Sequence, residues 1–136
     1  NVMDKSMLRA RGTKNIIHAM DAAGIKRLVC QSALGTGDSD KALPFIYRYF
    51  LVPVVMRSLY KDHNLQESHL KESSLDWTIV RPAILTDGAQ TGIYQHGFSA
   101  ENRTVKVKIS RADVADFMLK QVTDNHYLYK TPSLSY

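Results

Sequence analysis

The sequence has a single cysteine, few prolines and no hydrophobic run long enough to cross a membrane. Cys30 is the one cysteine among 136 residues. It has no partner for a disulfide within the chain, so we expect a reducing compartment, the cytoplasm. The longest apolar run, Ala42–Met56, is shorter than the roughly 20 residues that a membrane helix needs. It also includes Arg48 and two prolines, so no membrane association is expected.

Charge is not concentrated in any segment. The chain carries 18 lysines and arginines against 13 aspartates and glutamates, a net charge of +5. The basic residues are scattered and are not interleaved with aromatic residues, so nucleic-acid binding is not expected. The five histidines show no paired ligand spacing, and no metal site is predicted. A hydrophobic content of 44% with 23% charged residues is typical of one globular domain, here residues 1–136.

The first third of the chain predicts a helix followed by a strand. Apolar residues fall at helical spacing over Lys5–Ala23, and Gly24 is expected to end this helix in a left-handed conformation. Leu28–Gln31 is a short apolar run that predicts a buried strand. A helix, a glycine and a strand in this order form half of a βαβ unit.

The middle of the chain repeats this order. A helix is predicted over Val54–Glu72, in which several apolar residues and His63 share one face. A second buried strand is predicted over Trp77–Val80, and Pro82 is expected to end it because proline cannot donate to a sheet ladder.

The last third predicts two more strands and one more helix. Thr104–Ser110 alternates between polar and apolar residues and predicts a strand. Ser110 is expected to cap the following helix together with Asp113, and this helix to end near Val122. Tyr127–Lys130 is predicted as the last strand.

Strands that alternate with helices predict an α/β fold with a mainly parallel sheet. Only three or four strands can be counted, and the chain enters the fold on a helix. We therefore expect a partial doubly wound, Rossmann-like parallel sheet with flanking helices that lacks the N-terminal strands of the glycine loop.

The loop after the first predicted strand resembles a phosphate-binding loop only in part. It reads LVCQSALGTGDSDK, from Leu28 to Lys41, and contains Gly35 and Gly37. A dinucleotide fingerprint requires a third glycine, where this chain has Asp40. Asp38 and Asp40 would also repel a phosphate, so we do not expect this loop to hold one.

Three segments resemble a known family, namely GTKNIIHAMDAAGIKRLVCQSA, SSLDWTIVRPAIL and ISRADVADFML. In this order and at this spacing they are similar to the atypical short-chain dehydrogenase/reductases. The resemblance is to the NmrA-like, NAD(P)H-binding branch that includes flavin reductase/biliverdin-IXβ reductase. It implies NADP or NAD as cofactor and places the glycine-rich phosphate loop before the segments seen here. A missing N-terminal segment or a partner chain is then expected to cover the open sheet edge beside Leu28–Gln31.

The resemblance also implies the site residues. Ser32 would face the substrate and hydrogen-bond a reacting carbonyl or the cofactor amide, and the glycines after it would form a mobile loop over the substrate. The other interpretation of Ser32 is a strand-end residue without a catalytic role. The cofactor-binding residues implied by the resemblance are Cys30, Gln31, Ser32, Arg81, Pro82, Ala83 and Ile84. The reductase of this branch has a histidine at the position of Ala83, which weakens any transfer of its substrate to this chain.

The Tyr-x-x-x-Lys pair of ordinary short-chain dehydrogenases is absent. Its positions correspond to Leu59 and His63, and Tyr60 is expected to point elsewhere. His63 is either a satisfied, partly buried histidine or a residue beside the nicotinamide ribose, and Ser32 and His63 are the two catalytic candidates. Without an acid pair, hydride transfer to a planar flavin-like or quinone-like acceptor suits this site.

Two interpretations of the whole protein remain open at this point. The first is an NAD(P)H-dependent oxidoreductase that acts on such an acceptor, and the second is a non-catalytic NmrA-like regulator that binds dinucleotide and senses redox state. Four aromatic residues after the glycine loop either pack in a helix or form a wall for a planar substrate. They are Phe45, Tyr47, Tyr49 and Phe50.

Overall fold

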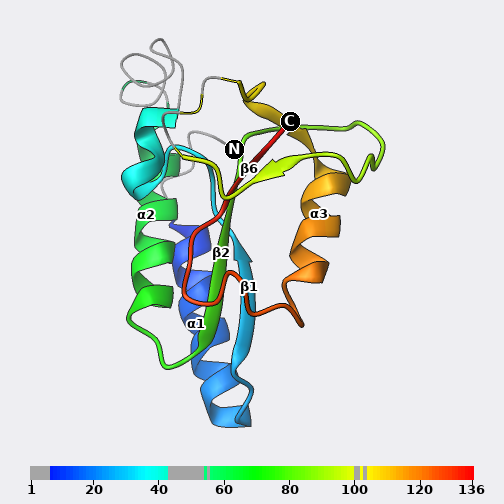
Figure 1. Ribbon diagram of the computed structural model, residues 1–136. Helices are drawn as coiled ribbons and strands as arrows, with labels where there is room; N and C mark the ends of the chain where they lie inside the picture. Colours follow the sequence, from blue (N-terminus) through cyan, green and yellow to red (C-terminus); the bar gives the residue numbers. More distant parts are fainter. Residues whose placement is uncertain (1–6, 43–53, 55, 100–101, 103) are drawn as a thin grey trace.

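The computed structural model describes residues 7–42, 54, 56–99, 102 and 104–136, which form a layered α/β arrangement (Figure 1). The described helices are α1 (Leu8–Ala23), α2 (Arg57–Lys71), α3 (Arg111–Lys120) and a short 3-10 helix over Gly37–Ala42. The described strands are β1 (Arg27–Gln31), β2 (Asp76–Pro82), β3 (Ile84–Thr86), β4 (Gln95–His96), β5 (Lys108–Ser110) and β6 (Ser133–Ser135). None of the described helices has the length and apolarity required to cross a membrane.

The main sheet has the strand order β1-β2-β6-β4. β1, β2 and β6 are parallel, and β4 pairs with β6 in the antiparallel sense. Leu28 lies opposite Trp77 and Gln31 opposite Val80, so the two predicted strands are parallel neighbours. β3 and β5 form a separate parallel pair. With α1 and α2 side by side on one face of the main sheet and α3 on the other (Figure 1), the predicted partial doubly wound α/β fold is confirmed.

β1 lies at one edge of this sheet. Among the described residues β1 pairs with β2 alone, as predicted for this strand. Most of its residues are half-buried. That a missing N-terminal segment or a partner chain covers the other side of β1 stays a prediction.

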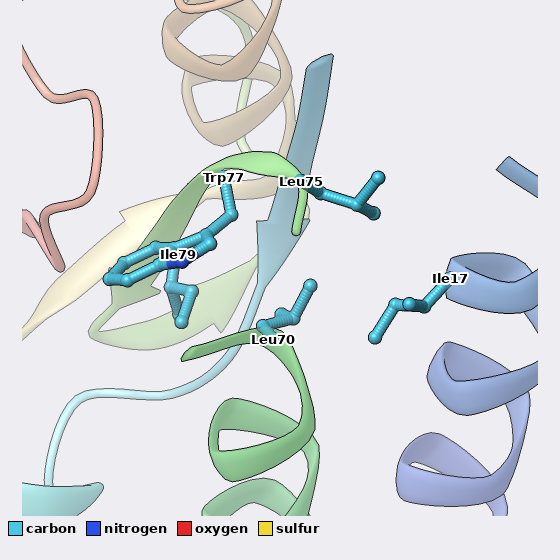
Figure 2. Packing of buried hydrophobic residues seen from close by; sticks show 5 residues of the cluster. All are labelled: Ile17, Leu70, Leu75, Trp77 and Ile79. Atoms are coloured by element: carbon cyan, nitrogen blue, oxygen red, sulfur yellow. The ribbon is translucent and has the colours of Figure 1, made fainter. Parts of the chain in front are cut away.

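β2 is buried along almost its whole length, as is usual for a strand of a parallel sheet with helices on both faces. Successive side chains point to opposite faces of the sheet. Trp77 and Ile79 therefore pack toward α1 and α2 (Figure 2), whereas Val80 packs toward α3. The first cluster contains Ile17, Leu70, Leu75, Trp77 and Ile79, and the second contains Val80, Ile109, Val114, Phe117 and Leu134.

Several predicted element ends are confirmed. Gly24 follows α1 with a φ of 70°, the left-handed conformation that glycine adopts at no steric cost. Pro82 is the last residue of β2. The Ser110 side chain accepts a hydrogen bond from the backbone N–H of Asp113 and caps α3. The expected start of the first helix at Lys5 and the aromatic cluster at 45–50 lie outside the described residues.

Two of the strand predictions were wrong in extent or place. The alternating segment Thr104–Ser110 forms a strand only in β5, because Val107 has a left-handed φ of 51° that interrupts an extended chain. Tyr127–Lys130 is a turn and not a strand, since Tyr129 has a φ of 57°. The last described strand is β6, which lies further along the chain.

The burial of the core predicts that replacing two different isoleucines will change the free energy of unfolding by very different amounts. Ile79 is fully buried and Ile93 is 81% exposed. Ile79→Ala should lower the free energy of unfolding by about 2–5 kcal/mol, because the transfer of the side chain from water is lost and a cavity is left. Ile93→Ala removes the same atoms and should change it by less than about 0.5 kcal/mol. Urea unfolding of both variants checks this, and equal losses would contradict the assignment of the core.

Candidate functional site

A cavity of about 370 Å³ lies where β1 and β2 end. Open α/β sheets bind ligands at the carboxyl ends of their parallel strands. Ser32 follows β1, Pro82 ends β2 and Ala83 follows it, and His63 comes from α2. The described residues around the cavity are Arg9, Gln31, Ser32, Ala33, Leu34, Met56, Leu59, Tyr60, His63, Pro82, Ala83, Ile84, Leu85, Val107 and Arg111.

Backbone pairing brings the two strand ends together. Ser32 N–H donates to the carbonyl of Val80 over 2.7 Å, and Leu34 N–H donates to the carbonyl of Pro82 over 2.9 Å. Ser32 is only 2% exposed, and its Oγ has a long contact of 3.4 Å with Thr36 Oγ1. The Ser32 hydroxyl also hydrogen-bonds Glu67 and helps to lower the pKa of that carboxyl, so it would have to turn away from Glu67 to bond a group placed in the cavity.

His63 is held as a neutral imidazole. Burial and the charge of Arg9 lower its pKa, because both disfavour the protonated ring. Its Nδ1 lies 3.2 Å from Gln66 Oε1, and this carboxamide donates through Nε2 to Thr13. A carboxamide oxygen accepts hydrogen bonds. Nδ1 therefore carries the proton, and Nε2 is left as an acceptor.

Tyr60 also lines the cavity, so the prediction that it points elsewhere was wrong. Leu59, Tyr60 and His63 share the wide face of α2 that borders the cavity, because a helix turns by only about 100° per residue. The Tyr60 hydroxyl donates to the Leu34 carbonyl over 2.9 Å, and burial raises its pKa. A phenol with a raised pKa and an engaged proton is poorly suited to proton exchange near neutrality.

Two predicted cofactor-binding residues have side chains that lie away from the cavity. Cys30 accepts a hydrogen bond from Gln66 Nε2 at 3.1 Å, and burial raises the pKa of its thiol to about 11. Arg81 points to α2 instead. The structure thus brings together Gln31, Ser32, Pro82, Ala83 and Ile84 with His63, and it does not bring Cys30 or the Arg81 guanidinium to them.

Arg81 forms a buried ion-pair network instead. Its Nε and Nη2 donate to the two carboxylate oxygens of Glu67 over 3.0 and 2.8 Å, and Lys71 Nζ donates to Glu67 over 3.1 Å. Both the Arg81 and Glu67 side chains are 3% exposed. Burial opposes the charge on Glu67, but its bonds with Arg81 outweigh burial and hold its pKa below the usual range. Arg81 also donates to Asp38 over 2.5 Å.

This network anchors the glycine loop to α2. Asp38 is bound by Arg81, Gly37 N–H donates to Asn64 Oδ1 over 3.1 Å, and Tyr60 holds the carbonyl of Leu34. A Cβ at Gly37 would lie 2.7 Å from Arg81 Nη2, so a side chain there would displace the guanidinium. The loop that was expected to be mobile is therefore held by hydrogen bonds at Leu34, Gly37 and Asp38. The Asp38 carboxylate binds the Arg81 guanidinium of the protein itself.

The Arg81 network predicts a strong dependence of stability on one buried guanidinium. Arg81→Met leaves Glu67 buried without its main partner and should lower the free energy of unfolding by about 3–5 kcal/mol. Asp38→Asn removes only the negative charge of the other acceptor of Arg81. The Asp38 side chain is 88% exposed, so this change should cost about 1 kcal/mol or less. Chemical denaturation of both variants checks this. A small loss for Arg81→Met would mean that the pair contributes little.

Comparisons with known proteins identify the family of this chain. The family described as NAD(P)H-binding matches residues 2–125. UPF0659 protein YMR090W of Saccharomyces cerevisiae is 32% identical over 125 residues, which are 90% of this chain and 52% of that protein. The chain thus spans about half the length of the curated relatives it matches.

Solved structures share the fold. ChuY of Escherichia coli O157:H7, described as an Anaerobillin Reductase, is 29% identical with a TM-score of 0.74, over 94% of this chain and 58% of that one. A short-chain dehydrogenase/reductase from Veillonella parvula, solved in complex with NADP, has a TM-score of 0.76 over 96% of this chain and 60% of that one. At 18% identity it shows the fold alone. With the matched residues covering most of its length, this chain belongs to the NAD(P)H-binding family.

Proposed function

We propose that the full-length protein is an NAD(P)H-dependent reductase that transfers hydride to a planar flavin-like or quinone-like acceptor. The observation that carries this proposal is the cavity at the ends of β1 and β2. Ser32 and a neutral His63 line this cavity together with mainly apolar side chains. Such walls fit the faces of planar rings. The likeness to a protein described as a reductase supports the same class of reaction.

The chain's own residues would bind and orient the reactants. When bound, the nicotinamide cofactor supplies the hydride. Pro82, Ala83 and Ile84 would pack against its ring, and the Ser32 hydroxyl would hydrogen-bond the carboxamide or the acceptor. The loop with Asp38 offers no cradle for a pyrophosphate, because its carboxylate would repel one. We therefore propose that the rest of the dinucleotide is held outside the described residues.

Proton supply distinguishes this site from that of an alcohol dehydrogenase. The Tyr60 proton is engaged by Leu34, and neutral His63 directs its N–H to Gln66. The acceptor would gain two electrons and one proton as hydride, and its second proton would come from water. Flavins and quinones accept hydride without an alkoxide intermediate, and for this reason they suit a site without a strong general acid.

Acceptor-dependent oxidation of reduced nicotinamide tests the proposal. The full-length protein should oxidise NADPH or NADH when riboflavin or menadione is added without oxygen, with one acceptor reduced per dinucleotide. Absorbance of both partners measures this ratio. Dinucleotide binding without turnover of either acceptor would contradict the proposal and favour a non-catalytic, redox-sensing regulator.

Ser32 should matter more for turnover than for cofactor affinity. A hydroxyl that meets the reacting group stabilises the transition state most, so Ser32→Ala should lower kcat about tenfold, the size expected for one hydrogen bond. The KM for NADPH should change far less. Ser135→Ala is a matched control, because Ser135 is also fully buried and does not line the cavity. Equal kcat values for Ser32→Ala and the unchanged protein would return Ser32 to a structural role.

A further inference from the structure

The charged side chains around the cavity all have the same sign. Among its described lining residues the charged ones are Arg9 and Arg111, and no carboxylate lines it. Arg9 lies in the first turn of α1 and Arg111 begins α3. These two helices cover opposite faces of the sheet (Figure 1). Since His63 is held neutral, these two guanidinium groups are the charged groups among the described lining residues, and each is paired with a carboxylate that does not line the cavity.

The backbone at Arg111 is firmly placed. Ser110, directly before it, is fully buried and lies opposite Thr86 in the β3–β5 pair. Asp113 accepts hydrogen bonds from Ser110 Oγ over 3.1 Å and from the Tyr136 hydroxyl over 2.6 Å. It also accepts from the backbone N–H of Gly92 over 2.8 Å. These contacts fix the first turn of α3, so the Arg111 side chain begins from a rigid point beside the cavity.

The guanidinium of Arg111 can exchange its partner at little cost. Its ion pair is with Asp87, over 2.5 Å, and the two side chains are 58% and 91% exposed. Exposed pairs of this kind contribute about 0–1 kcal/mol. A guanidinium has five N–H donors and binds carboxylate or phosphate through two at once. An anionic group in the cavity could therefore replace Asp87.

Arg9 is less free to exchange its partner. Its guanidinium lies 3.4 Å from Asp62, a buried carboxylate. Asp62 also accepts hydrogen bonds from the backbone N–H groups of Arg9 and Ala10. Asp62 is thus part of the structure at the start of α1 and stays beside Arg9. Of the two arginines, Arg111 is the better placed to bind a ligand.

The residues around Arg111 indicate which kind of ligand would fit beside it. Ile84, Leu85 and Val107 line the cavity with it, and Ile84 is 47% exposed. An apolar wall next to a displaceable cation suits a molecule with a planar apolar body and an anionic substituent. Resting on the proposed function, we propose that the acceptor carries a carboxylate or phosphate and that Arg111 is the specificity-determining residue that binds it.

Flavin mononucleotide and riboflavin separate the anion from the ring, because they share one isoalloxazine and differ by a phosphate. In the full-length protein, Arg111→Gln should lower the ratio of kcat/KM for flavin mononucleotide to that for riboflavin roughly tenfold, the size expected for a charge-assisted hydrogen bond. Asp87→Asn removes the negative charge that competes for Arg111 and should raise this ratio. Lys108→Gln removes the same charge from an exposed residue that does not line the cavity, and it should leave the ratio unchanged.

Binding without NADPH gives a second readout that needs no turnover. Quenching of flavin fluorescence should show tighter binding of flavin mononucleotide than of riboflavin, and Arg111→Gln should remove the difference. If this holds in a protein that reduces neither flavin, the proposed reduction fails and the anion site stands. An unchanged flavin preference in Arg111→Gln overturns the anion site. A higher KM for NADPH with that preference unchanged would assign Arg111 to the dinucleotide and overturn it as well.

Discussion

The parallel pairing of β1 with β2 decides where every candidate residue lies. Its register places Gln31 opposite Val80, and the backbone of Ser32 and Leu34 extends the pairing to Val80 and Pro82. Two strand ends that are about 50 residues apart in the chain thus form one wall of the cavity. A shift of one residue would exchange the faces of a strand. Trp77 and Ile79 would then leave the core on the side of α1 and α2, so the packing of the core and the position of the site are set by the same register.

The alternation along β2 also explains why Arg81 is a structural residue. Trp77, Ile79 and Arg81 share one face of the strand, the face covered by α2. At the buried end of this face a cation is tolerated only with a close partner, and Glu67 of α2 supplies it. Pro82, one residue further, belongs to the opposite alternation and reaches the cavity. Two consecutive residues of β2 thus have different roles: Arg81 forms a buried ion pair, and Pro82 lines the candidate site.

Much of the fold could be predicted because short stretches of the sequence carry the signals for its main elements. A glycine after an amphipathic helix and a continuous apolar run are local signals, and they located α1, β1 and β2. β3, β4 and β6 were missed because strands of two or three residues show no periodicity and exist through their pairing partners. Ser32, His63, Pro82 and Ala83 were selected by resemblance and do meet in one cavity. Arg9 and Arg111 were missed as residues that line the cavity. Both lie in the first turns of helices. Because α1 runs antiparallel to β1, it begins at the edge of the sheet where the parallel strands end (Figure 1).

The charge of the cavity and the neutrality of His63 are two results of one arrangement. Burial and the charge of Arg9 lower the pKa of His63 more than the carboxylates of Asp62 and Glu67 raise it. A protonated His63 would add a third cation to a space that no described carboxylate lines. His63 directs its N–H to Gln66 and Tyr60 directs its hydroxyl to Leu34, so neither group presents a proton to the cavity. Binding and orientation, rather than acid catalysis by the protein, are the contributions that the proposed function requires of these residues.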